Sequence, residues 1–175
     1  TLEMQKNLTY ALMGLTLVLL QIFLFDNIAL TSYFHPLIYV AFIILLPLDT
    51  KPIWTMSLSA VMGLLVDVTT GMGGLNVIAC TALGFFRPMI LSAVSGHSIT
   101  GENAITGLHR FTDKIMLWYI SAMVFIHSVI YFFLEALSWD HILRTLLRLL
   151  VSDLGAILFI WYFVKLFIEK ILKLK

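Results

Sequence analysis

Two ionisable residues, Asp67 and Arg87, lie within stretches of sequence that are otherwise apolar. A charged side chain at the centre of a lipid bilayer costs about 2.5–3.5 kcal/mol or more, so it faces the protein interior. There it either binds a ligand or partner, or makes a structural polar contact that fixes the packing of helices. Counted along two antiparallel helices, the two residues differ in depth by roughly 9 Å. The sequence therefore leaves open whether the carboxylate and the guanidinium meet.

Small and polar residues accompany both charges at helical spacing. One helix face carries Ala60, Gly63 and Asp67, and one face of the next helix carries Asn76, Cys80, Gly84 and Arg87. Small residues let two helix backbones approach closely, and polar residues bond across the contact. We therefore predict that the two faces meet or line a shared polar core. We include in this core Gly74, in the turn between the helices, and Pro88, which removes a backbone donor and is expected to kink its helix.

A third polar stripe consists of His127, Tyr131 and Glu135, spaced four residues apart. Such a stripe fits either a proton relay or a buried histidine capped by a tyrosine, and we favour the second interpretation. The five histidines show no metal-ligand spacing, and no Walker, Rossmann or G-x-S-x-G pattern occurs. We predict no catalytic, cofactor or metal site, and no enzymatic activity.

Charged and polar residues also gather near the ends of the apolar stretches that we place on the outer side of the membrane. They are Asp26, Asn27, Glu135, Arg144, Arg148 and Asp153. We expect most of them to be solvated charges at the membrane interface. The alternative is an outward docking surface for a periplasmic or membrane partner.

The elements that must position these residues are membrane-spanning helices. Apolar residues make up 61% of the chain and charged residues 12%, against roughly 45–50% and 25% in soluble domains. About 20 apolar residues cross a hydrocarbon core of about 30 Å, which leaves room for about six spans. We predict an all-α, polytopic membrane protein that forms one transmembrane domain over residues 1–175. The predicted spans are 8–25, 34–48, 53–70, 75–95, 115–138 and 142–168.

The lysine and arginine bias of the loops sets the orientation of such a protein. Six spans place Arg144 and Arg148 on one side, and on the other side Lys6, Lys51, Arg110, Lys114, Lys165, Lys170, Lys173 and Lys175. We therefore expect both termini and the 96–114 loop in the cytoplasm. The lysines of the C-terminal tail are expected to be an ordinary flank of the last span, with attraction to anionic membrane lipid as the alternative. The net charge of +1 favours no nucleic-acid partner.

Several motifs resemble the MreD family of rod shape-determining proteins in their joint order and spacing. They are Gly63-Leu-Leu-Val-Asp67, then Gly74-Leu-Asn-Val-Ile-Ala79, then Phe85-Phe-Arg87-Pro88. Earlier segments agree as well: Leu19-Leu20-Gln21-Ile-Phe-Leu-Phe25-Asp-Asn27, Pro36-Leu-Ile-Tyr39 and Leu45-Leu46-Pro47. The resemblance covers about residues 15–95, and it is closest to members from Bacteroidetes-type bacteria.

The resemblance implies a non-enzymatic protein of the bacterial inner membrane that belongs to the cell-elongation machinery. Its first partner would be MreC, and through MreC it would connect with MreB, the RodA glycosyltransferase and a class B penicillin-binding transpeptidase. A homodimer is left open. The family is also similar in fold to the six-helix substrate-binding subunits of energy-coupling-factor transporters. The alternative function is therefore a membrane subunit that binds a small, vitamin-like molecule.

Overall fold

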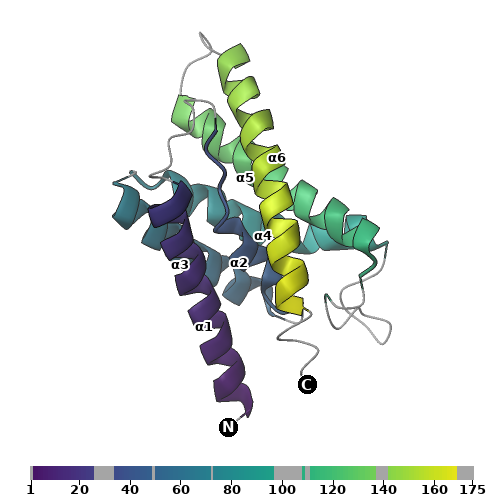
Figure 1. Ribbon diagram of the computed structural model, residues 1–175. Coiled ribbons are helices and arrows are strands. Elements are labelled where there is room, and N and C mark those ends of the chain that lie inside the picture. Colours follow the sequence, from purple (N-terminus) through teal and green to yellow (C-terminus); the bar gives the residue numbers. More distant parts are fainter. Residues whose placement is uncertain are drawn as a thin grey trace.

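The computed structural model describes residues 2–25, 34–48, 50–71, 73–96, 108, 111–136 and 142–168 (Figure 1). Its α-helices are α1 (Leu2–Leu20), α2 (Val40–Leu45), α3 (Pro52–Thr70), α4 (Leu75–Ser95), α5 (Asp113–Ala136) and α6 (Ile142–Phe167). A π-helical turn, η1 (Gln21–Phe25), continues α1. The described part of the chain contains no strand, which confirms the predicted all-α class.

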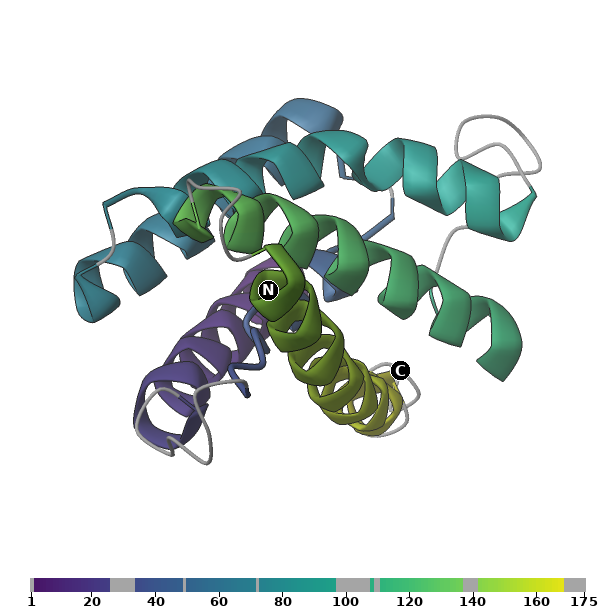
Figure 2. The ribbon, with the colours of Figure 1, turned by 90° about the horizontal axis from the view of Figure 1, so that it is seen from above.

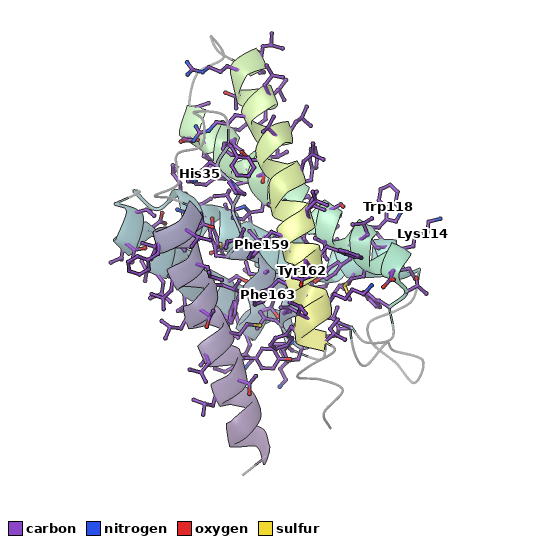
Figure 3. All side chains as sticks on the ribbon, in the orientation of Figure 1. His35, Lys114, Trp118, Phe159, Tyr162 and Phe163 are labelled. Carbon is purple, nitrogen blue, oxygen red and sulfur yellow. The ribbon has the colours of Figure 1, made fainter. Side chains whose placement is uncertain are left out.

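Four helices are long and apolar enough to cross a membrane, judged by length and composition. They are Pro52–Thr70, Leu75–Val94, Asp113–Ala136 and Ile142–Phe167, and a shorter apolar helix covers Leu8–Leu24. Side chains project outward from all of these helices (Figure 3), and many of the exposed ones are large and apolar, such as Val68, Phe85 and Leu158. Lipid is the solvent that fits such faces. A helical membrane protein is therefore confirmed, whereas the count of six spans is not.

The helices surround α2 in two groups (Figure 2). Helices α3, α4 and α5 lie side by side, while α1 and α6 lie on one face of this layer and diverge from each other. Each helix from α3 onward packs on the next one along the chain. The short α2 contacts α1, α3, α4, α5 and α6, and all of its residues are buried. The core is thus built around a helix that touches every other α-helix.

The segment 34–48 differs from its predicted helical span. Only Val40–Leu45 is α-helical, which is about 9 Å long at a rise of about 1.5 Å per residue, against a hydrocarbon core of about 30 Å. Residues 34–37 have no regular structure, because Pro36 lacks a backbone N–H and disfavours helix at the residue before it. Pro47 ends the helix in the same way. Irregular backbone at membrane depth is tolerated only inside protein, and the surrounding helices supply that enclosure.

Candidate functional site: a polar core around the broken segment

The crossing of α3 and α4 is as close as the small residues predicted. A Cβ added to Gly63 would lie 2.5 Å from the carbonyl oxygen of Asn76, and one added to Gly84 would lie 2.7 Å from the Oγ of Ser59. The two predicted faces therefore meet. One detail differs, because Ala60 is only partly buried and the neighbouring Ser59 is the residue that faces α4.

Asp67 reaches across this crossing to the beginning of α4. Its Oδ1 accepts hydrogen bonds from the backbone N–H of Asn76 (3.2 Å) and from the Asn76 side-chain amide (2.8 Å). Its Oδ2 accepts the backbone N–H of Val77 at 2.9 Å. The first N–H groups of a helix have no partner within that helix. Gly74, at a φ of 95°, makes the turn before α4 but has no side chain to cap it. The carboxylate on α3 therefore supplies the missing cap.

Asn76 extends the hydrogen-bond network to Tyr39, in the segment before α2, and through it to His127 on α5. Its amide oxygen accepts the hydroxyl of Tyr39 at 2.5 Å, and that hydroxyl lies 3.2 Å from Nε2 of His127. Since Tyr39 donates to Asn76, its oxygen is left to accept, which assigns a proton to Nε2 of His127. The Sγ of Cys80 lies 3.7 Å from the same nitrogen. All four side chains are buried.

Arg87 does not contact Asp67. Its side chain bonds instead to groups at the C-terminal end of the short helix α2. Its Nε donates to the hydroxyl of Tyr119 at 3.1 Å, its Nη1 to the carbonyl of Pro47 at 3.4 Å, and its Nη2 to the carbonyl of Leu46. The last carbonyls of a helix carry partial negative charge and lack partners within it. No described carboxylate pairs with the guanidinium, which is 2% exposed. The guanidinium of Arg87, whose partner the sequence did not reveal, therefore bonds to carbonyls at the C-terminal end of α2.

Pro88 lies inside α4, which continues as one helix to Ser95. The expected kink therefore does not break the helix. The proline still removes one backbone donor beside the guanidinium.

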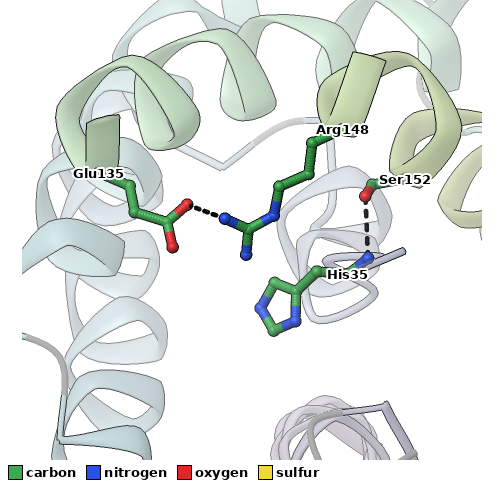
Figure 4. Close-up of polar contacts among 4 residues, drawn as sticks. All are labelled: His35, Glu135, Arg148 and Ser152. Carbon is green, nitrogen blue, oxygen red and sulfur yellow. Dashed lines mark hydrogen bonds and ion pairs between the residues drawn. The ribbon is translucent and has the colours of Figure 1, made fainter. Parts of the chain in front are cut away.

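The irregular residues before α2 are held from two sides by side chains. Gln21, in η1, accepts the N–H of Ile38 at 2.9 Å and donates to the carbonyl of Pro36 at 3.3 Å. On the opposite side, the Oγ of Ser152 accepts the backbone N–H of His35 at 2.9 Å (Figure 4). These bonds replace the helical hydrogen bonds that this stretch lacks. Backbone N–H and C=O groups at the depth of the lipid need such partners within the protein. We predicted no role in packing for Gln21 or Ser152, although each is a polar residue in an apolar run.

The stripe of His127, Tyr131 and Glu135 does not continue as a relay. Tyr131 stacks on His127 with ring centroids 6.3 Å apart, but Glu135 forms an ion pair with Arg148 at 2.9 Å (Figure 4). The Nδ1 of His127 is buried and has no hydrogen-bond partner among the described residues. The favoured interpretation of a buried, tyrosine-capped histidine fits this geometry, with Tyr39 rather than Tyr131 as the cap.

The outer group of charges is only partly the solvated set that we expected. Glu135 and Arg148 are 24% and 30% exposed in their paired side chains, and Arg148 also lies over the ring of Phe132. Asp153 is buried, and neither of its carboxylate oxygens has a hydrogen-bond partner in the described part of the chain. Arg144 is exposed on α6. Asp26 and Asn27, like most of the 96–114 loop, lie outside the described residues.

A pocket of about 300 Å³ opens beside the network, between η1 and the turn that joins α3 to α4. Its polar lining comprises Gln21, His35, Tyr39, Thr69, Thr70, Asn76 and Tyr131. The side chains of Asn76, Thr69 and Thr70 form hydrogen bonds to other protein groups. The pocket is lined by polar residues together with the apolar Ile22, Leu37 and Val66, and none of these lining residues is a carboxylate, lysine or arginine.

The chemistry that this core offers is hydrogen bonding to backbone ends. Cys80 and His127 lie in contact, but both are completely buried, so a substrate has no access to the thiol. Within the described ranges, no group of three or more His, Cys, Asp or Glu side chains is placed to hold a metal ion. Comparisons of this chain with models of protein families, with curated proteins and with solved structures find no match.

Proposed function

We propose that this protein is a non-catalytic scaffold of the bacterial cell-elongation machinery in the inner membrane. The resemblance of residues 15–95 to the MreD family carries this proposal. In the proposal its direct partner is MreC, and its indirect partners are MreB, RodA and a class B penicillin-binding transpeptidase. Its two termini face the cytoplasm, as the lysine bias favours.

The observation that most supports a scaffold is how the motif residues are used. Asp67 bonds to the first N–H groups of α4, and Arg87 bonds to the carbonyls of Leu46 and Pro47, which directly follow α2. The space that a side chain would take at Gly63 or Gly84 is occupied by atoms of the neighbouring helix. Both charges bond only to groups of the protein itself, chiefly to backbone groups beside helix ends, which is the use expected of residues that fix the packing of helices. A protein of this kind acts through its membrane-embedded surface, by close packing and polar contacts with other helices.

Depletion of the protein in its rod-shaped host tests the proposal. We expect cells to become round, lateral wall synthesis to disperse, and MreC to be recovered with the tagged protein from native membranes. A variant that lacks the Arg87 guanidinium should lower recovery of MreC in proportion to its loss of folded protein. Depleted cells that keep their rod shape would refute the scaffold.

The pocket of about 300 Å³ supports a second candidate function, the binding of a small molecule for transport. Ligand pockets span about 300–1,000 Å³, so this one lies at the lower limit. Growth on vitamin-limited medium distinguishes the two functions. A depleted strain that keeps its shape but needs a vitamin supplement would favour the transporter subunit, whereas a round strain without such a need favours the scaffold.

A further inference from the structure

Three lysines at one end of the helix bundle each lie one helical turn from a tryptophan. Lys51 is the N-cap residue of α3 and Trp54 lies in its first turn, Lys114 and Trp118 lie in the first turns of α5, and Trp161 and Lys165 lie in the last turns of α6. The N–H of Trp54 bonds to the carbonyl of Lys51 at 3.0 Å, and in the other two pairs the spacing of four residues places both members on the same face of their helix. Lys165 bonds to Asp113, the first residue of α5, at 3.4 Å, and α3, α4 and α5 pack in sequence. The three pairs therefore belong to the same end of the bundle.

The third pair differs from the first two because its lysine already has an anionic partner in the protein. The Nζ of Lys165 lies 4.8 Å from the ring centroid of Trp161 and pairs with the carboxylate of Asp113. Lys51 and Lys114 are exposed and form no ion pair with any described residue. Their tryptophans are 62% and 63% exposed. Figure 3 shows Lys114 and Trp118 both pointing away from the bundle.

An exposed lysine beside an exposed indole matches the headgroup region of a membrane. The amphipathic indole ring prefers that depth, and its N–H is a hydrogen-bond donor. One ammonium group near the surface of an anionic membrane strengthens binding to that membrane roughly fivefold. The same faces continue into the membrane with exposed apolar side chains, Leu58 one helical turn beyond Trp54 and Phe125 two turns beyond Trp118. A phosphate carried by acyl chains satisfies all of these groups, whereas free phosphate satisfies only the lysine and the N–H.

We propose that the pairs Lys51–Trp54 and Lys114–Trp118 each bind the phosphate of an anionic phospholipid. The lysine contacts the phosphate, the indole N–H donates to the headgroup, and the acyl chains lie along the apolar face below. The pair Trp161–Lys165 binds no such lipid, because Asp113 neutralises its lysine. This inference is independent of the scaffold proposal, since it concerns the lipid that surrounds the chain in either function.

The test uses the full chain in lipid nanodiscs of phosphatidylcholine, with and without phosphatidylglycerol. Lipids that remain bound to the protein are counted by native mass spectrometry, and the ratio of the two lipids is compared with their ratio in the disc. We expect wild-type protein to enrich phosphatidylglycerol. Each of Lys51→Gln and Lys114→Gln should weaken binding at its own site roughly fivefold. The two Lys→Arg variants, which keep the charge, should retain enrichment.

Lys165→Gln is the matched control, and it should leave the enrichment unchanged. All of the substituted side chains are at the surface, so thermal unfolding in phosphatidylcholine alone should be unaltered. Equal losses from Lys165→Gln and Lys114→Gln would show a general charge effect and overturn the two-site proposal. So would the absence of enrichment in the wild type, or complete competition by inorganic phosphate at millimolar concentration.

Discussion

Replacement of Arg87 by methionine removes the donor that holds the end of α2. The carbonyl of Leu46 then loses its partner, whereas the carbonyl of Pro47 keeps the backbone N–H of Thr50 at 3.3 Å. Tyr119 keeps the carbonyl of Ile44 as its acceptor at 3.5 Å. A buried polar group without a partner costs about 1–3 kcal/mol. Loss of the buried charge returns part of its desolvation cost, so we expect a net destabilisation of about 1–2 kcal/mol.

A lysine at this position should give an intermediate loss. Its ammonium keeps the charge, but it cannot reach two carbonyls and a hydroxyl with the planar fork of a guanidinium. Unfolding in mixed micelles, with a denaturing detergent as titrant and tryptophan fluorescence as signal, measures both variants. Lys114→Met, which removes an exposed cation, is the control and should change the free energy of unfolding by less than about 0.5 kcal/mol.

The same experiment tests whether the two membrane charges are coupled. Arg87 follows Asn76 by 11 residues of α4, which is roughly 16 Å, and Asp67 bonds at the level of Asn76. Effects at separate sites add to within about 0.3–0.5 kcal/mol. We therefore expect Asp67→Asn and Arg87→Met to be additive. A coupling energy above about 1 kcal/mol would refute the assignment of each charge to its own helix end.

Three further predictions concern the crossing, the network and the topology. Gly63→Ala should destabilise by about 1–3 kcal/mol in the same unfolding assay, because its Cβ would meet the Asn76 carbonyl, whereas Gly73→Ala, which meets nothing within 4 Å, should be nearly neutral. Tyr39→Phe should cost about 1–3 kcal/mol by leaving the Asn76 oxygen and the His127 nitrogen without their hydroxyl; no loss would mean that water replaces it. Cysteine introduced at Thr100 should resist a membrane-impermeant thiol reagent in spheroplasts, and cysteine at Trp139 should react; the opposite pattern would overturn the orientation.

The sequence predicted the long helices and their facing sides well. Continuous apolar runs defined α3 to α6 to within two residues of their predicted bounds. The close contact at Gly63 and Gly84 followed from small residues at helical spacing. These features depend on residues near one another in the chain, where a period of 3.6 is visible.

The segment 34–48 escaped prediction because hydropathy does not distinguish a buried irregular segment from a helical span. Pro36 and Pro47 were read as tolerated at the ends of a helix, whereas they confine the helix to Val40–Leu45. The roles of Tyr39 and Tyr119 were missed for a related reason. A tyrosine in an apolar run is unremarkable until its hydroxyl is seen to meet a polar atom from another helix.

Composition and spacing alone determined that the chain is a membrane protein and that Asp67 and Arg87 face its interior, because a charge that faces lipid is too costly. Only the tertiary structure decided what those charges bind. Asp67 and Arg87 find backbone N–H and carbonyl groups at helix ends. Every residue carries such groups, so no side-chain pattern reveals which of them will be left without a partner. That depends on where a helix breaks and which neighbour arrives there, and both are settled by packing across the whole bundle.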